Sequence, residues 1–420
     1  SKVVPWLGES YKWKKENRVL IIRTRDNVRW SDGKPYSAYD VEFTFNLKKK
    51  FPALDGTGNW KYLKSVTAVD SNHVEFIFSR IYVPGFEVLA GQPIVPKHVW
   101  SNVDDPVKYT DPNPIGTGPF TEIVKFTNQV WELGKNPNYW QKGKPKIDKL
   151  RFPAFLSNEQ APLALIKGEV DWSGNFIPAI DRIFVSKDPE HNKYWFPKSG
   201  GSIFLYLNTT QAPFDNIDFR KAISMAIDRE LITKVAMYDY TSPAHQTAIS
   251  GSFLHYRLSS ENINESWVGF HPKQSVEKIK SLGYKKNSSG YWADSTGKEV
   301  QISIGIVSGW ADWIRAGQII SKNLEGIGIR SRVKTQDFGA WFNDLQTGEF
   351  SGAIAWAESG ANPFPMYEGL MASKNIKPVG EHAGTNWHRF GLSEVDSLVS
   401  VFEVTSDESM KNKLIYRMQE

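Results

Sequence analysis

The chain of 420 residues contains no cysteine. This absence excludes disulfide bonds, thiolate metal sites and cysteine nucleophiles. Long apolar stretches are missing too: runs such as 203–207 and 353–357 fall far short of the roughly 18 residues that a membrane-spanning helix needs. Neither sign of charge dominates, because 51 basic residues face 46 acidic residues. Without a clustered basic surface, we expect no nucleic-acid partner.

Motifs of catalysis and metal binding are also missing. The chain has no glycine-rich phosphate loop, no dinucleotide fingerprint, no nucleophile elbow and no paired-histidine zinc motif. Its eight histidines are scattered, and the closest pair, His382 and His388, matches no ligand spacing. We therefore expect no metal, no cofactor and no enzymatic activity. Carboxylates are plentiful, so a glycoside hydrolase remains an alternative.

Aromatic residues, in contrast, are abundant. The chain has 16 Trp, 16 Tyr and 24 Phe, more tryptophan than a core of this size requires. Some of these rings are expected in the core or between packed elements: Trp30, Trp131, Trp140, Trp172 and Trp195. The others are candidates for ligand contact.

Strand and helix patterns alternate along most of the chain, which predicts α/β layers. A connector rich in Asp, Pro and Asn is expected at 104–114. The expected strands are 19–22, 66–69, 73–78, 118–124, 129–133, 149–152, 193–196, 202–207, 300–306, 329–335 and 351–356. The expected helices are 158–167, 218–236, 276–282, 311–324, 338–345, 393–402 and 407–417.

Several sequence motifs follow one another in an order that points to one family. They are IRTRDNVRWSDGKP at 22–35, PIGTGPF at 114–120, KNPNYW at 135–140, GEVD at 168–171, and LNT at 207–209 followed by PFD and RKAISMAIDR at 213–215 and 220–229. In these motifs the chain resembles the family 5 extracytoplasmic solute-binding proteins of ABC transporters, which include oligopeptide-, dipeptide- and nickel-binding members. The C-terminal half matches more loosely.

The resemblance implies a two-lobed, periplasmic-binding-protein-like α/β fold with mixed sheets and a hinge, and with ligand held in the cleft between the lobes. The first lobe is expected at 1–205, with an inserted subdomain at 1–103 and a main sheet subdomain at 114–205, and the second at 206–420. Family members usually have a further strand before the first residue and a return segment after the last, so we expect the first lobe to be incomplete.

The resemblance also implies a partner and a location. The expected partners are the permease subunits of an ABC importer, and the expected form is a monomer. The location would be periplasmic or extracellular, either free or anchored through a removed N-terminal segment. The motif residues themselves, such as Asp32, Arg220 and Asp228, are expected to build the scaffold rather than to touch ligand.

One position near the end of an expected strand bears on the ligand class. Peptide-binding relatives hold the peptide amine with an aspartate just after the strand that here ends near Trp356, and Gly360 stands at that position. Glu358, two residues earlier, would point to the same face only if no bulge intervenes. A buried ammonium without a partner carboxylate is costly, so the sequence disfavours a peptide.

Aromatic residues gather at the expected ends of strands, where α/β sheets place ligands. Flat rings stack well on the apolar face of a sugar ring, and polar side chains can bond its hydroxyls. The predicted ligand-binding residues are the rings Trp310, Trp313, Phe338, Trp341 and Trp356, the carboxylates Asp312, Asp337 and Glu358, Gly201 in the small-residue loop 198–202, and Trp60 and Gln92 in the first lobe.

We therefore expect an oligosaccharide-binding protein, with a β-linked sugar favoured. Two alternatives remain open: a di- or oligopeptide-binding protein of the same family, and a glycoside hydrolase that uses the same rings.

Overall fold

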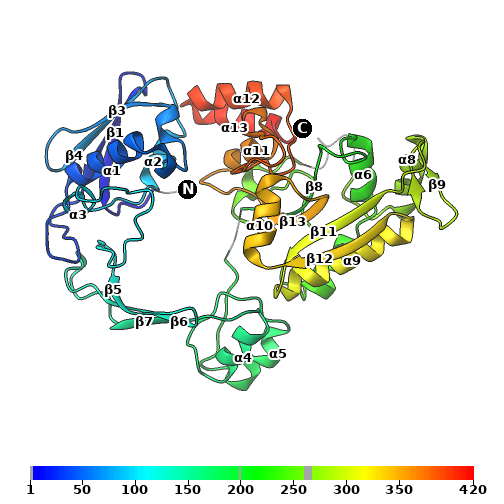
Figure 1. The fold of residues 1–420 in the computed structure, drawn as a ribbon, viewed down its shortest axis with the longest axis horizontal. Coiled ribbons are helices and arrows are strands. Elements are labelled where there is room, and N and C mark those ends of the chain that lie inside the picture. The colour runs from blue at the N-terminus through cyan, green and yellow to red at the C-terminus, as the bar shows by residue number, and fades with distance from the viewer. Residues whose placement is uncertain (1–2, 198–199, 260–266) are drawn as a thin grey trace. The chain divides into compact units, whose positions relative to one another are not determined.

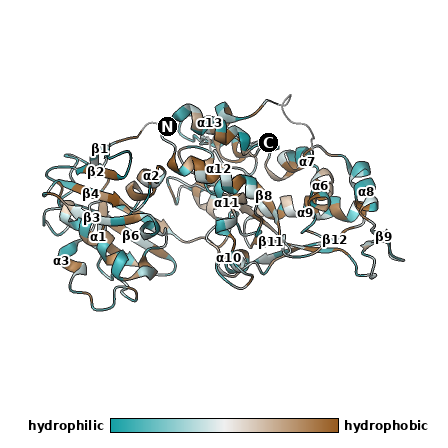
Figure 2. Cartoon of the chain, turned by 90° about the horizontal axis from the view of Figure 1, so that it is seen from above, coloured by the Kyte–Doolittle hydropathy of each residue, from teal (hydrophilic) through white to brown (hydrophobic). Residues whose placement is uncertain are grey.

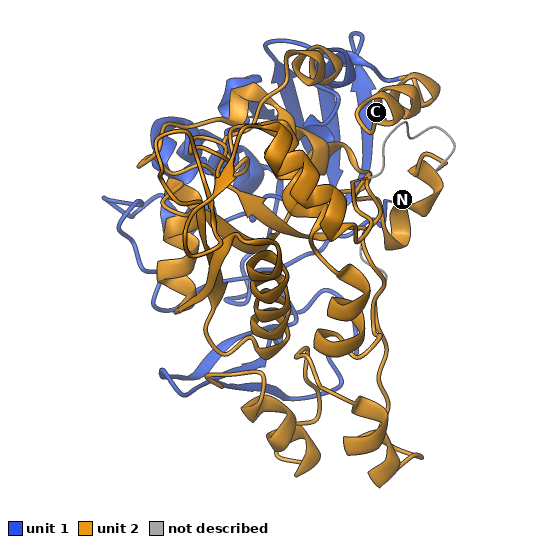
Figure 3. Cartoon of the chain, turned by 90° about the vertical axis from the view of Figure 1, so that its right-hand side faces the viewer, with its two compact units in different colours: residues 1–154, 401–406 blue, residues 155–400, 407–420 orange. Residues whose placement is uncertain are grey.

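The computed structural model describes residues 3–197, 200–259 and 267–420. The chain forms two compact units: unit 1 is Ser1–Ala154 with Val401–Ser406, and unit 2 is Phe155–Ser400 with Asp407–Glu420 (Figure 3). The division expected at 205/206 does not separate these units, because it cuts strand β8 (Ile203–Leu207), which pairs along its length with β13 (Gly352–Trp356). The lobe boundaries and the hinge stay predictions.

Unit 1 begins with an antiparallel sheet in the order β1-β2-β4-β3. Its strands are β1 (Gly8–Lys14), β2 (Val19–Thr24), β3 (Leu63–Ala68) and β4 (His73–Phe78). The alternation expected in β4 is confirmed, because Val74, Phe76 and Phe78 are each at most 3% exposed. Helix α1 (Ala38–Lys50) packs on this sheet, and α2 (Gly85–Ala90) and α3 (Lys97–Trp100) follow.

A second sheet of unit 1 contains the expected hairpin. Its strands β5 (Phe120–Phe126), β6 (Val130–Lys135) and β7 (Lys149–Pro153) are antiparallel in that order. The tryptophans follow the expectation only in part. Trp30 is 2% exposed, as expected, and Trp140 packs against the core of the first sheet, but Trp131 is 40% exposed. In unit 2, Trp172 and Trp195 are each 67% exposed, so their assignment to the core was wrong.

Unit 2 is built on a mixed sheet in the order β12-β11-β13-β8. Strands β11 (Gln301–Val307) and β12 (Arg330–Gln336) are parallel, β13 is parallel to β11, and β8 is antiparallel to β13. Helices α6 (Ile217–Met225), α8 (Pro272–Ser281) and α9 (Ala311–Ile327) contribute to one core. The buried residues of α9 recur every three or four positions, at Gly317, Ile320, Leu324 and Ile327, as one buried stripe requires. Figure 2 shows the elements of this unit coloured by hydropathy.

The two faces of this sheet differ in character. Ile302, Ile304 and Ile306 of β11 are buried in the core that α9 covers. The alternate positions, Ser303, Gly305 and Val307, belong to the opposite face, where α10 (Phe338–Thr347) packs (Figure 1). Small side chains on that face leave room for large rings from α10.

The other elements of unit 2 surround this sheet. They are α4 (Gln160–Ile166), α5 (Ile180–Ile183), α7 (Arg229–Leu231), β9 (Lys285–Lys286), β10 (Trp292–Ala293), α11 (Phe364–Met371) and α13 (Glu408–Arg417). Helix α12 (Ser393–Val404) begins in unit 2, and its last residues belong to unit 1.

Two expected elements differ from the structure. The helix expected at 218–236 is broken after Met225, because Asp228 caps a new helix through a bond from Leu231 N of 2.9 Å. The backbone N–H of Asp228 is also taken, by Asn323 Oδ1 at 3.0 Å. The strand expected at 193–196 is absent from the described chain, where residues 193–197 form no regular element.

The family motifs build local structure, as expected. Asp32 accepts a bond from Lys34 N in a turn where Gly33 has a φ of +85°, which favours glycine. Arg220 donates to the carbonyl of Phe214 at 2.8 Å. Asn208 is fully buried and donates to the carbonyls of Gly348 and Phe350 at 2.8 and 2.9 Å. This asparagine ties the end of β8 to the turn before β13.

We predict that Asn208→Ala lowers the free energy of unfolding by about 1–3 kcal/mol, because two buried carbonyls lose their donors. Denaturant unfolding measures the change. Asn343→Ala is the matched control, since Asn343 is exposed on α10 and its side chain forms no bond within the described residues. Equal unfolding free energies for the two variants would contradict the assignment of Asn208 to the scaffold.

Candidate functional site

The aromatic rings predicted from separate segments lie together in unit 2. Trp310 and Trp313 stand at the start of α9, with ring centroids 4.8 Å apart and planes at 86°. Trp356 ends β13, and its ring lies 6.4 Å from that of Trp313. Phe338 opens α10 at 6.2 Å from Trp310. These residues follow β11, β12 and β13 or end them, so the rings cap the C-terminal edge of the sheet.

Trp341 lies at the centre of this aromatic cluster. Its ring is 5.5 Å from Trp356, 5.7 Å from Phe338 and 6.2 Å from Trp310. Only 1% of Trp341 is exposed, so its ring supports the others and offers no free face to a ligand. Its prediction as a ligand contact is therefore revised to that of a supporting residue, because Gly305 beneath it leaves space for the indole.

The outer rings keep part of their surface open. Phe338 is 48% exposed, and Trp310, Trp313 and Trp356 are half-buried. Each packs edgewise or tilted against a neighbour, which fixes its orientation. A set of fixed, partly open rings can stack on a ligand with little loss of side-chain entropy.

Two further rings complete the cluster and were not predicted. Phe342 stacks on Phe338 at 5.6 Å and on Trp356 at 6.1 Å. Trp387 meets Trp356 at 6.0 Å and 90°, and is itself 3% exposed. Phe342 could have been found, because it stands one helical turn after Phe338. Trp387 had no local signal, since it comes from a distant loop.

Two predicted carboxylates already have structural partners. Asp312 accepts a bond from Asn158 at 2.9 Å, and Asn158 also accepts one from Ala311 N at 3.0 Å. Asp337 caps α10 by accepting from Ala340 N at 3.0 Å. Each keeps one carboxylate oxygen for another donor. Their role toward ligand stays a prediction.

Gly309 positions the loop that carries Trp310. Its φ is +83°, and a Cβ at this position would lie 2.6 Å from the carbonyl oxygen of Leu156. Asn158 N also donates to the Gly309 carbonyl at 3.0 Å. The end of β11 is thereby held against residues 156–158, because only glycine permits this close approach in a left-handed conformation.

Glu358 differs from these acids. It is half-buried beside Tyr206, Thr385 and Trp387, and within the described residues its carboxylate has no hydrogen-bond or ion-pair partner. Burial raises the pKa of Glu358 above its ordinary value. An unpartnered carboxylate next to the aromatic cluster is available for a ligand hydroxyl or ammonium.

The remaining predicted residues have mixed surroundings. In unit 1, Trp60 donates its indole N–H to the Phe45 carbonyl at 2.9 Å, and the Gln92 amide bonds Lys48 and the Val88 carbonyl. Both side chains thus serve unit 1 itself. Gly201 accepts a bond from Ser250 at 2.9 Å, while Lys198 and Ser199 of the same loop lie outside the described residues.

Two other features are absent from the part of the chain that the structure describes. Within residues 3–197, 200–259 and 267–420, no helix combines the length and apolar character needed to cross a bilayer. Across the same ranges, no three His, Asp or Glu residues converge as metal ligands would.

The raised pKa of Glu358 predicts a pH-dependent stability. Below the unfolded-state pKa the carboxyl group is neutral in both states, so its burial places no charge inside the folded protein. As the pH rises through the folded-state pKa, the folded protein must hold a buried charge and loses stability. Glu358→Gln should therefore raise the melting temperature at about pH 8 and leave it nearly unchanged at about pH 4. Glu349→Gln, at an exposed carboxylate, is the control. An equal gain at both pH values would show that ionisation is not the cause.

Comparison with known proteins identifies relatives along nearly the whole chain. Residues 2–378 match the family described as bacterial extracellular solute-binding proteins, family 5 Middle. The glutathione-binding protein GsiB of Escherichia coli O1:K1 / APEC is 23% identical over 423 residues, which cover 99% of this chain and 77% of that protein.

Solved structures agree with this match. A periplasmic oligopeptide-binding protein from Thermotoga maritima, crystallised with mannohexaose, superimposes with a TM-score of 0.88 at 27% identity, covering 99% of this chain and 79% of that one. The oligopeptide-binding protein AppA of Bacillus subtilis, in complex with a nonapeptide, gives a TM-score of 0.84 at 21% identity, with 99% and 81% covered. The predicted α/β fold with mixed sheets is confirmed, and the chain belongs to the family 5 bacterial extracellular solute-binding proteins.

Proposed function

We propose that this chain is the oligosaccharide-binding component of an ABC importer and that the aromatic cluster of unit 2 holds the sugar. The observation that carries the proposal is the convergence of Trp310, Trp313, Phe338 and Trp356 at one edge of the sheet. Rings of this kind pack on the C–H face of a pyranose, and their fixed orientation selects sugars whose faces match.

Polar groups beside the rings would supply hydroxyl recognition. Glu358 has an unpartnered carboxylate, and Asp312 and Asp337 each have one oxygen free of the bonds described above. Carboxylates accept hydrogen bonds from sugar hydroxyls strongly because the acceptor is charged. A sugar with a differently placed hydroxyl would leave buried polar atoms unpaired, which lowers its affinity.

The relatives support more than one ligand class. The Thermotoga maritima protein named as oligopeptide-binding was crystallised with mannohexaose, at 27% identity to this chain. GsiB is named as glutathione-binding, and AppA was crystallised with a nonapeptide, at 23% and 21% identity. Sugar binding is therefore compatible with this fold even where a protein is named for peptides.

A peptide is the second candidate, and Glu358 is the observation that favours it. Its half-buried carboxylate could pair with a peptide ammonium, although Gly360 stands where peptide-binding relatives were expected to carry an aspartate. Glu358→Gln separates the two cases. The loss of one charge should abolish most peptide affinity, because the ammonium loses its partner. It should weaken sugar affinity only moderately, because an amide oxygen can still accept a hydrogen bond from a sugar hydroxyl.

A calorimetric ligand screen tests the proposed function directly. Manno- and cello-oligosaccharides and di- to pentapeptides are titrated into the protein, and melting temperatures are measured with each ligand. We expect saturable binding of at least one oligosaccharide, with about 2.7 kcal/mol of stabilisation at a hundredfold excess over Kd. Binding of peptides together with no response to any sugar would overturn the proposal.

The same sugars test the hydrolase alternative. After prolonged incubation with an oligosaccharide that binds, we expect no new reducing ends, because a solute-binding protein releases its ligand intact. Steady release of reducing ends, removed by a glycosidase inhibitor, would instead support catalysis.

Substitution of the open rings predicts a loss of affinity. Trp310→Ala and Phe338→Ala should each weaken oligosaccharide binding by about 1–3 kcal/mol, measured by calorimetry, because each removes a stacking face. Trp356→Ala is less suited, since that ring also packs against the buried Trp387. Trp172→Ala, at a 67% exposed ring outside the cluster, is the control. Unaltered affinity in both cluster variants would remove these rings from the site.

A further inference from the structure

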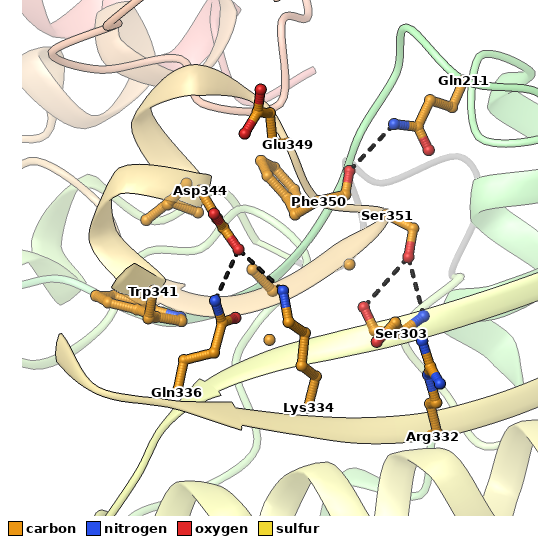
Figure 4. Close-up of a pocket in the computed structure, with 14 residues that line it drawn as sticks. Gln211, Ser303, Arg332, Lys334, Gln336, Trp341, Asp344, Glu349, Phe350 and Ser351 are labelled. Atoms are coloured by element: carbon orange, nitrogen blue, oxygen red, sulfur yellow. Dashed lines mark hydrogen bonds and ion pairs between the residues drawn. The ribbon is translucent and has the colours of Figure 1, made fainter. Parts of the chain in front are cut away.

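A hollow separate from the open rings lies in unit 2, on the face of the sheet where α10 packs. The pocket has a volume of about 290 Å³ and is walled by β11, β12, the start of β13 and the end of α10 (Figure 4). Small residues are part of its lining, among them Ser303, Gly305 and Ala353. These residues precede the strand ends that carry the aromatic cluster, so the pocket is a separate feature with Trp341 as a shared wall.

Two hydrogen-bonding groups beneath this pocket lack partners. Trp341 is 99% buried, and its indole Nε1 forms no hydrogen bond within the described part of the chain. The hydroxyl oxygen of Ser303 is likewise buried without a partner there. A buried polar atom without a bond costs about 1–3 kcal/mol. Because an indole N–H can only donate, the group that satisfies Trp341 must be an acceptor.

Among the described residues that line the pocket, Lys334 has an ion-pair partner and Arg332 has none. Lys334 pairs with Asp344 at 3.0 Å, and Gln336 donates to the same carboxylate at 2.8 Å, as the dashed lines of Figure 4 show. Arg332, in contrast, has no hydrogen-bond or ion-pair partner among the described residues. Glu349 is the other acid of the lining, and its carboxylate points away from Ser303 and Arg332 in Figure 4.

We propose that this pocket binds a small oxyanion, either a carboxylate or a phosphate group, through Arg332, Ser303 and Trp341. The guanidinium of Arg332 presents a planar fork of donors that fits two oxygens of either group. The Ser303 hydroxyl and the Trp341 indole N–H add donors from the floor. In Figure 4 the ends of Lys334 and Gln336 lie beside Trp341. On binding, we expect these flexible ends to shift outward and admit the oxygen.

This site is independent of the ligand that the aromatic cluster takes. Ser303 and Arg332 stand opposite one another in the register of β11 and β12, toward the N-terminal ends of these strands, whereas the open rings cap the other edge of the sheet. Trp341 contributes its N–H to the pocket and its ring to the cluster. An oxyanion site could therefore exist whether the main ligand is a sugar or a peptide.

Calorimetry with simple anions tests the proposal on the full chain. Acetate, citrate and inorganic phosphate are titrated at constant ionic strength, with chloride as the reference for nonspecific binding. We expect saturable binding of at least one oxyanion and none of chloride. A carboxylate that binds while phosphate does not, or the reverse, identifies the group. No saturable binding of any oxyanion at millimolar concentration would overturn the proposal.

A matched pair of variants assigns the binding to this pocket. Arg332→Gln should weaken the oxyanion by about tenfold or more, because a charge-assisted bond is lost. Arg330→Gln is the control: the same charge is removed from the same strand and the same face, but Arg330 pairs with Glu299 and lies outside the lining. Equal affinities in the two variants would contradict the assignment.

A third variant fills the floor. A Cβ on Gly305 would lie 3.6 Å from the Gly352 carbonyl oxygen and 3.7 Å from Trp341 Cδ1, which is ordinary contact, so Gly305→Ala should fold normally. Its methyl group occupies the floor next to the Trp341 indole and should reduce oxyanion affinity several-fold. A folded Gly305→Ala protein with unchanged oxyanion affinity would place the anion elsewhere.

Discussion

The contact between the buried indole of Trp341 and the small-residue face of β11 and β13 is the constraint on which the site depends. Gly305 and Ala353 leave the space that this ring fills, and α10 can approach the sheet only because they do. The ring of Trp341 in turn contacts the rings of Phe338, Trp310 and Trp356. A side chain larger than alanine at either position would push α10 outward and separate the rings.

Fixed rings have a consequence for binding. A ligand that stacks on free aromatic side chains must first immobilise them, and that ordering lowers affinity. Here the orientations are set by ring-to-ring packing and by backbone restraints, such as the close approach at Gly309 and the bond from the Tyr206 hydroxyl to the Trp356 carbonyl at 2.9 Å. The outer rings are therefore prepared for a flat ligand surface before it arrives.

The family, the fold class and the gathering of rings could be predicted from the sequence, because the order of the motifs and the positions of the strand ends can be read from it. The exposure of each ring could not be predicted, because the burial of Trp341 depends on small residues that other strands supply. Trp387 could not be predicted for a similar reason, because only the folded chain brings it into contact with Trp356. The break after Met225 was missed because Asp228 competes with a continuous apolar pattern by capping a new helix.

A crystal structure of the protein grown with a manno- or cello-oligosaccharide would show whether the open rings hold the sugar. We expect pyranose rings lying flat against Trp310, Phe338 or Trp356, with a hydroxyl near the Glu358 carboxylate. Density for the sugar away from these rings, or a structure in which Glu358 instead clasps the ammonium of a bound peptide, would contradict it.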